Sequence, residues 1–135
     1  MALQSHDKKF LVAEKNGKAT AKREKHQNSE IFEVTFMALD QVQFKGYHQK
    51  YLSAEPNGIV NANQGNLQWT VSNRMTWTVE YSRWNKGFAM YNYTFKSKYN
   101  GKYLEHDNDG ALNAIKSNAG LWGHFKIINV KGKKA

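Results

Sequence analysis

Short runs of alternating apolar and polar residues fill the chain, and turn sequences separate them. Residues 50–54, Lys-Tyr-Leu-Ser-Ala, run into Pro56-Asn57-Gly58, and the alternation resumes at residues 60–62. A period of two places side chains on alternate faces of a β-strand. Asn-Gly between two such runs is typical of a tight hairpin turn, because both residues tolerate positive φ. The pattern therefore predicts short strands joined by hairpins, and it predicts no helix.

This pattern occurs three times, and the three copies align without gaps from the basic-aromatic-Leu motif to a shared alanine. The motifs are Lys9-Phe10-Leu11, Lys50-Tyr51-Leu52 and Lys102-Tyr103-Leu104, followed by the turn glycines Gly17, Gly58 and Gly110 and by Ala21, Ala62 and Ala114. A strand-like run precedes each hairpin, at residues 2–5, 42–45 and 93–97. Another follows each hairpin, at residues 31–36, 76–81 and 124–129, with Phe32, Trp77 and Phe125 equivalent. The second copy is longer, which indicates an inserted loop around residues 65–73.

Three copies of about four strands predict an all-β fold of the β-trefoil class with pseudo-threefold symmetry: a closed six-stranded barrel capped by three hairpins. Residues 1–135 form one domain in this prediction, with repeats at about 1–40, 41–84 and 88–130 and a basic tail at 131–135. The repeated aromatic and leucine residues are expected to fill the core in threefold layers.

Composition limits the chemistry. The chain has 135 residues, a formal net charge of +9 and no Cys, which excludes disulfides and cysteine nucleophiles. The five His show no metal-site spacing, and the acidic segment 105–110 lacks the length of a calcium loop. No nucleophile motif or phosphate loop occurs. We therefore expect a protein that is not an enzyme, has no cofactor or metal, has no transmembrane segment, and is cytoplasmic.

The segment 50–62, "KYLSAEPNGIVNA", resembles the repeated motif of the fascin-like and hisactophilin-like β-trefoils, a family of actin cross-linking proteins. The weaker copies extend the resemblance over nearly the whole chain. It implies a cytoskeletal protein that binds actin filaments. Bundling would need two filament contacts, offered either by two surfaces of one domain or by a homodimer. The chain departs from hisactophilin in its low His content and in lacking the Gly required for N-terminal lipidation.

The excess positive charge lies in the first and third copies. Residues 1–25 carry seven Lys or Arg against three acids, residues 26–92 carry five of each, and residues 93–135 carry eight against three. In a trefoil these copies are neighbours, so the sequence predicts one basic side that binds the acidic filament. The candidate actin-binding residues are Lys8, Lys9, Lys22, Arg23, Lys25, Lys98, Lys102, Lys116, Lys131, Lys133 and Lys134.

Three aromatic residues fall outside the repeat pattern: Trp69, Trp84 and Phe88. They are candidates for a protein interface, where Trp is enriched. The competing interpretation is that the longer loops fold back and bury them.

Other interpretations of the charge stay open. A binding module for acidic glycans or phosphoinositide membranes is the main alternative, and nucleic-acid binding is a third hypothesis. The excess Lys would also suit a protein that only needs solubility.

Overall fold

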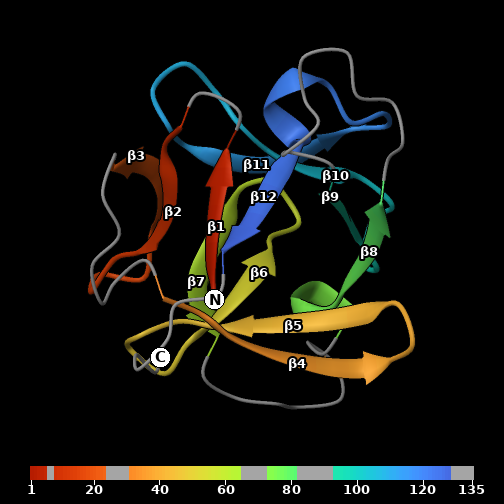
Figure 1. The fold of residues 1–135 in the computed structure, drawn as a ribbon, viewed down its shortest axis with the longest axis horizontal. Coiled ribbons are helices and arrows are strands. Elements are labelled where there is room, and N and C mark those ends of the chain that lie inside the picture. The colour runs from red at the N-terminus through yellow and green to blue at the C-terminus, as the bar shows by residue number, and fades with distance from the viewer. Residues whose placement is uncertain (6–7, 24–30, 65–72, 82–92, 129–135) are drawn as a thin grey trace.

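The fold of this chain is all-β, and its strands pair antiparallel. A computed structural model describes residues 1–5, 8–23, 31–64, 73–81 and 93–128 (Figure 1). Its strands are β1 (Ala2–Ser5), β2 (Phe10–Ala13), β3 (Ala19–Arg23), β4 (Glu33–Ala38), β5 (Gln41–Lys45), β6 (Tyr51–Ala54), β7 (Val60–Gln64), β8 (Trp77–Tyr81), β9 (Tyr93–Ser97), β10 (Tyr103–His106), β11 (Leu112–Lys116) and β12 (Phe125–Ile128). A 3₁₀ turn, η2 (Leu121–Gly123), precedes β12. No helix in the described ranges is long and apolar enough to cross a membrane.

The strands form one sheet whose path runs β3-β2-β1-β12-β9-β8-β5-β6-β7, with β10 and β11 joined through β9 and with β4 joined to β5. The first and last strands pair side by side, with Ala2 opposite Ile128. The start of β4 meets the start of the chain: Phe32 N–H donates to the Met1 carbonyl at 2.7 Å, and the Met1 amino group donates to the Phe32 carbonyl at 2.6 Å. Beyond Phe32, the ladder partner of β4 is β5.

Three hairpins have the same turn geometry. In the first, the Glu14 amide donates to the Lys18 carbonyl at 2.8 Å, and Asn16 Oδ1 accepts from the Lys18 amide at 3.0 Å. Gly17 adopts φ 90°, as Gly58 and Gly110 do at equivalent positions, whereas Asn16 does not have positive φ. The loops are thus three residues long, a tight turn followed by a left-handed glycine. The expectation that both Asx and Gly use positive φ is wrong. In the first two turns the side chain of Asn16 or Asn57 instead accepts a hydrogen bond from the backbone, and in the third turn Asp107 accepts it.

The three hairpins contact one another through equivalent backbone hydrogen bonds. Ala21 donates to Gly110 at 2.7 Å, Ala62 to Gly17 at 2.9 Å and Ala114 to Gly58 at 2.8 Å. All three alanines are buried. A small side chain at these positions lets the backbones of neighbouring hairpins approach, which explains why Ala recurs in each copy.

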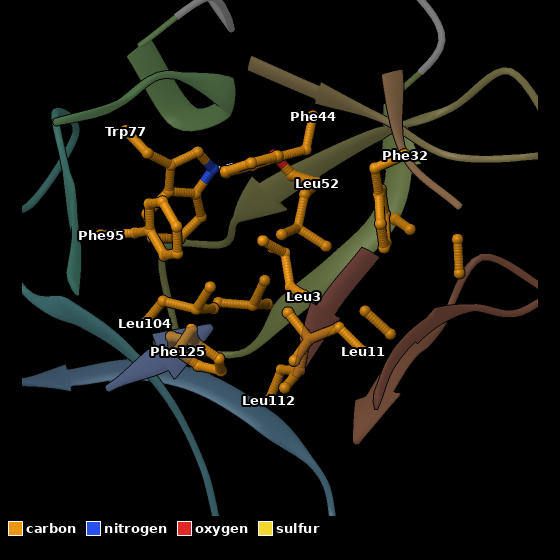
Figure 2. Packing of buried hydrophobic residues seen from close by; sticks show 14 of the residues in the cluster. Leu3, Leu11, Phe32, Phe44, Leu52, Trp77, Phe95, Leu104, Leu112 and Phe125 are labelled. Atoms are coloured by element: carbon orange, nitrogen blue, oxygen red, sulfur yellow. Dashed lines mark hydrogen bonds between the residues drawn. The ribbon is translucent and has the colours of Figure 1, made fainter. Parts of the chain in front are cut away.

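Equivalent side chains from the three copies fill the core (Figure 2). Three sets contribute: Leu11, Leu52 and Leu104; Phe32, Trp77 and Phe125; and Leu3, Phe44 and Phe95. Trp77 satisfies its indole N–H by donating to the Leu52 carbonyl at 3.3 Å. Phe44 and Phe95 pack edge to face with their ring centroids 5.1 Å apart, a favoured geometry for aromatic pairs.

The prediction that the aromatic residue before each leucine lies in the core is only partly right. Phe10 is buried, but Tyr51 and Tyr103 are half-buried. Because side chains alternate along a strand, the fully buried Leu52 and Leu104 turn these neighbouring tyrosines to the other face of the sheet.

Candidate basic surface

The aromatic residues Phe10, Tyr51 and Tyr103 are each paired with one residue on either side, on two neighbouring strands, so that three opposite residues form a row across the sheet. The rows are Gln4–Phe10–Arg23, Lys45–Tyr51–Gln64 and Lys96–Tyr103–Lys116. Residues directly opposite on antiparallel strands share a face of the sheet. In the third row alone, the aromatic residue has a lysine on both sides.

Tyr103 is held by contacts at both its ring and its hydroxyl. Lys96 Nζ lies 5.9 Å from the Tyr103 ring centroid, within reach of a cation–π attraction. The Tyr103 hydroxyl donates to Glu80 Oε1 at 2.7 Å, and the Thr94 hydroxyl donates to the same oxygen at 3.3 Å. The hydrogen bond to Glu80, followed by burial and by the negative charge of Glu80, raises the pKa of Tyr103 to about 12. The phenol therefore remains a neutral hydrogen-bond donor at physiological pH.

Lys116 is positioned by a buried carboxylate. Its Nζ lies 3.4 Å from Glu105 Oε1, and its side chain is 64% exposed while that of Glu105 is 4% exposed. The Gly120 amide donates to Glu105 Oε2 at 3.0 Å. Gly123 packs so closely that a Cβ there would lie 2.9 Å from Glu105 Cγ. The carboxylate is thus fixed from two sides, and Lys116 extends from it towards solvent.

Three further cations surround the turn between β9 and β10. Lys102 Nζ donates to Ser117 Oγ at 2.9 Å, and Lys98 is exposed. The Arg74 guanidinium carbon lies 5.1 Å from the ring centroid of Tyr99. The Lys98 amide donates to the Thr76 carbonyl at 2.9 Å, which joins this turn to the segment that carries Arg74.

We call this set of five cations the basic patch: Arg74, Lys96, Lys98, Lys102 and Lys116. Two carboxylates, Glu80 and Glu105, lie among them, and each is already engaged by a neighbouring side chain. The patch therefore presents excess positive charge together with two tyrosines, Tyr99 and Tyr103. It is suited to an acidic surface.

The other predicted basic residues of the described ranges lie in the first copy. Lys8 is exposed in the turn after β1, with φ 68°. Lys9 lines a small depression with Asp107 and Asp109 at the tip of the third hairpin. Lys102 and Lys116 lie at the opposite end of that hairpin, where Tyr103 pairs with Lys116. The predicted residues thus fall into two groups, with acidic side chains at the hairpin tip between them.

Several predicted site residues yield no side-chain geometry. Lys22 and Arg23 belong to β3, where Arg23 is opposite Phe10. The remaining predicted residues lie outside the described ranges: Lys25, Lys131, Lys133, Lys134, Trp69, Trp84 and Phe88. Their proposed roles stay predictions.

Sequence reasoning missed Arg74, Lys96 and Tyr99 as members of a surface. Lys96 was detectable, because it directly follows the buried Phe95, and the equivalent residues Gln4 and Lys45, which follow Leu3 and Phe44, are likewise only half-buried. Arg74 was not detectable, since it comes from the second copy, whose net charge is close to zero. Only the pairing of β8 with β9 brings its segment beside the third copy.

In the part of the chain that the structure describes, no three His, Asp or Glu residues are grouped so that they could hold a metal ion. The acidic tip of the third hairpin has a structural use, because Asp107 Oδ1 accepts from the amides of Asp109 and Ala111 at 2.9 and 3.0 Å.

Comparison with known proteins finds no match for this sequence. No protein-family model matches this sequence, and no curated protein matches it either. The function must therefore be argued from the residues of this chain.

Proposed function

We propose that the chain is a non-catalytic binding module of the β-trefoil class whose partner is the actin filament. The trefoil assignment rests on the three equivalent hairpin turns, the three equivalent hydrogen bonds between hairpins, and the contact of Phe32 with Met1. A barrel closed through β1 and β4 would extend that last contact along the strands. The family resemblance of residues 50–62 supports the same assignment.

The basic patch is the observation that carries the proposed function. Four of its cations lie on strands or in the turn between β9 and β10, and Arg74 lies in the short helical segment 73–75. Four are held by a ring, a hydroxyl or a carboxylate: Arg74, Lys96, Lys102 and Lys116. A positioned lysine loses less side-chain entropy on binding than a freely rotating one. Filaments present many acidic side chains, and the resemblance to actin cross-linking proteins makes the filament the partner of choice. In this proposal the protein works in the cytoplasm, on the cytoskeleton.

Binding would proceed in two stages. The net charge of +9 attracts an acidic filament over a distance of about 8 Å, the Debye length at physiological ionic strength. Lys98 and Lys102 at the turn then form ion pairs, while Tyr99 and Tyr103 supply apolar contact area. Attraction of this kind mainly raises the association rate and is weakened by salt.

Filament co-sedimentation with matched charge reversals tests the proposal. The test variant is Lys98→Glu/Lys102→Glu, which leaves Lys116 paired with Glu105. The control is Lys15→Glu/Lys50→Glu, in which Lys50 is the second-copy equivalent of Lys102 and both lysines are exposed. We expect the test variant to weaken binding by roughly tenfold or more and the control to weaken it far less.

Two results would reject the proposal. One is a wild-type protein that stays in the supernatant with filaments at low salt. The other is equal weakening by both variants, which would indicate attraction by net charge without a binding surface. Retention of the wild type on heparin or on phosphoinositide vesicles, without filament binding, would identify an acidic glycan or lipid as the partner instead.

A further inference from the structure

The outer face of the three hairpins carries a depression that all three of them line. Along β3, β7 and β11, residues that face the core alternate with residues that face outward. The inward residues of β7, Val60 and Ala62, are buried. The outward residue between them and its equivalents in the other two copies are polar and half-buried: Thr20, Asn61 and Asn113. These three line one depression of about 730 Å³, a volume within the range of small-molecule sites.

Backbone bridges hold these polar residues in place. Each hairpin pairs with the next, so that the three hairpins form a closed cycle. The bridges are Lys18–Asn61, Ile59–Asn113 and Ala111–Thr20. The polar side chains therefore lie on a fixed framework of paired backbone, and binding a ligand there would cost little ordering of the chain.

One polar atom of the depression is buried without a partner. Asn113 Oδ1 accepts no hydrogen bond within the described part of the chain. Burial of an unsatisfied acceptor is unfavourable, so such groups usually bind water or another molecule. The side chains of Thr20 and Asn61 likewise form no hydrogen bond to a described residue. A ligand in the depression can therefore bond to all three side chains without breaking a contact between them and the described chain.

The rest of the lining limits the chemistry of the ligand. Hydroxyl and carboxamide groups both donate and accept hydrogen bonds, as sugar hydroxyls do. Ile59 and Ile115 line the same depression and are 48% and 56% exposed, so they offer apolar surface to the C–H groups of a sugar ring. Asp107 and Asp109 also line it, against one described lysine, Lys18. The two carboxylates accept from hydroxyls and repel an anionic ligand.

We infer that this depression binds a neutral mono- or disaccharide. Asn61 and Asn113 bond to its hydroxyls, Asn113 Oδ1 gains a donor, and the two isoleucines contact its C–H face. None of the five cations of the basic patch is among the described residues that line the depression. The saccharide site is therefore separate from the surface proposed to bind a filament, and it does not depend on that proposal.

NMR titration of the full chain with lactose, maltose, chitobiose and mannobiose tests the inference. We expect at least one of these sugars to bind with a Kd of about 1 mM or tighter and to shift the side-chain amide signals of Asn61 and Asn113. The backbone amide signal of Ala111 follows binding in the variants.

Matched variants locate the site. Asn61→Ala/Asn113→Ala should weaken binding by roughly tenfold or more. The control Asn63→Ala/Asn118→Ala removes two exposed carboxamides that do not line the depression, and it should bind like the wild type. A thermal unfolding curve checks that each variant is folded. If the test variant is unfolded, Ile59→Ala at an exposed position replaces it and should weaken binding by about threefold or more.

The inference is overturned if none of the sugars shifts the signals of Asn61 and Asn113, or if the folded test variant binds as tightly as the control. An oligolysine peptide that shifts these signals where the sugars do not would assign the depression to a basic peptide and reject the saccharide. The charge reversal Lys98→Glu/Lys102→Glu should leave sugar binding unchanged. Its loss in that variant would place the sugar at the basic patch and also reject the inference.

Discussion

At the scale of the residue, two non-glycine residues in the described ranges have positive φ: Gln49, with φ 66°, and its first-copy equivalent Lys8, with φ 68°. The Gln49 turn gives a test. The Gln49 amide donates to the Gly46 carbonyl at 3.0 Å in the turn between β5 and β6. The third copy has Gly101 in the corresponding turn, with φ 71°. A side chain with a Cβ is disfavoured in this region by roughly 1–2 kcal/mol, whereas glycine enters it freely.

Replacing Gln49 by Gly should therefore stabilise the fold by about 0.5–1 kcal/mol, the backbone strain that is relieved minus the added entropy of the unfolded chain. Lys50→Gly is the control, because Lys50 does not have positive φ, and it should destabilise the fold. Urea unfolding measures both. A Gln49→Gly protein less stable than the wild type would show that the turn does not hold this conformation.

Tyr103 yields a prediction for pH. Its pKa is raised to about 12 from an ordinary value of 10, so the folded state holds the phenolic proton more tightly than the unfolded state. The stability from this group is complete below pH 10 and is lost as the pH rises through 12. The phenolate absorbance of the wild type minus that of Tyr103→Phe should titrate near 12, and Glu80→Gln should bring that midpoint down. A midpoint near 10 in the wild type would contradict the contact between Tyr103 and Glu80.

At the scale of the element, the hairpin turns are fixed both by conformation and by space. Gly58 has φ 88°, and a Cβ there would clash with Ile115 Cγ2. Gly101 has φ 71°, but its nearest neighbour to such a Cβ is Lys96 Cε at 4.0 Å. The two glycines therefore separate the cost of the backbone conformation from the cost of the clash.

Gly101→Ala should destabilise the protein by about 1–2 kcal/mol through backbone strain alone. Gly58→Ala should cost more, because the side chain of Ile115 must also move. Adding Ile115→Ala should recover part of the extra cost. If the two glycine variants are equally stable, the hairpins do not pack as closely as the structure indicates.

The equivalent leucines test the core in the same way. Leu52 is fully buried, and Leu52→Ala should cost roughly 2–5 kcal/mol from the lost apolar contacts and the cavity left behind. Ile59→Ala, a change of similar size at an exposed position, should cost far less. A small effect of Leu52→Ala in urea unfolding would contradict the assignment of this leucine to the core.

Strand positions could be predicted from the sequence because the period of two and the turn glycines mark them. Residues 2–5 and 93–97 are strands with those bounds, and the runs that follow the hairpins start within two residues of the predicted positions. The sequence could not show which face of the sheet Tyr51 and Tyr103 occupy. Tyrosine counts as apolar in an apolar–polar pattern whether its side chain is fully buried or only half-buried. Nor could the extension of β4 to Ala38, since it depends on pairing with β5.

The candidate site was harder to predict, for a physical reason. A surface is assembled by strand pairing, so Lys96 and Lys116 meet across Tyr103 although they are distant in sequence. Charge counts along the chain identified the third copy as basic but grouped Lys8 and Lys9 with it. The acidic side chains of Asp107 and Asp109 lie beside Lys9, and a count along the chain does not show this.

At the scale of the whole molecule, two surfaces have different chemistry. The basic patch gathers five cations beside two engaged carboxylates, whereas the acidic side chains of Asp107 and Asp109 lie beside Lys9 at the tip of the third hairpin. The first surface is proposed to bind a filament. Salt should weaken that binding, because it screens the attraction between the filament and a protein of net charge +9.

Filament co-sedimentation at low and at physiological salt, with the wild type and the two charge-reversal variants, is the most direct test of the central claim. The account predicts that the wild type pellets with filaments at low salt, less at physiological salt, and that Lys98→Glu/Lys102→Glu loses binding while Lys15→Glu/Lys50→Glu largely keeps it. Wild-type protein that remains in the supernatant at both salt concentrations would contradict the account.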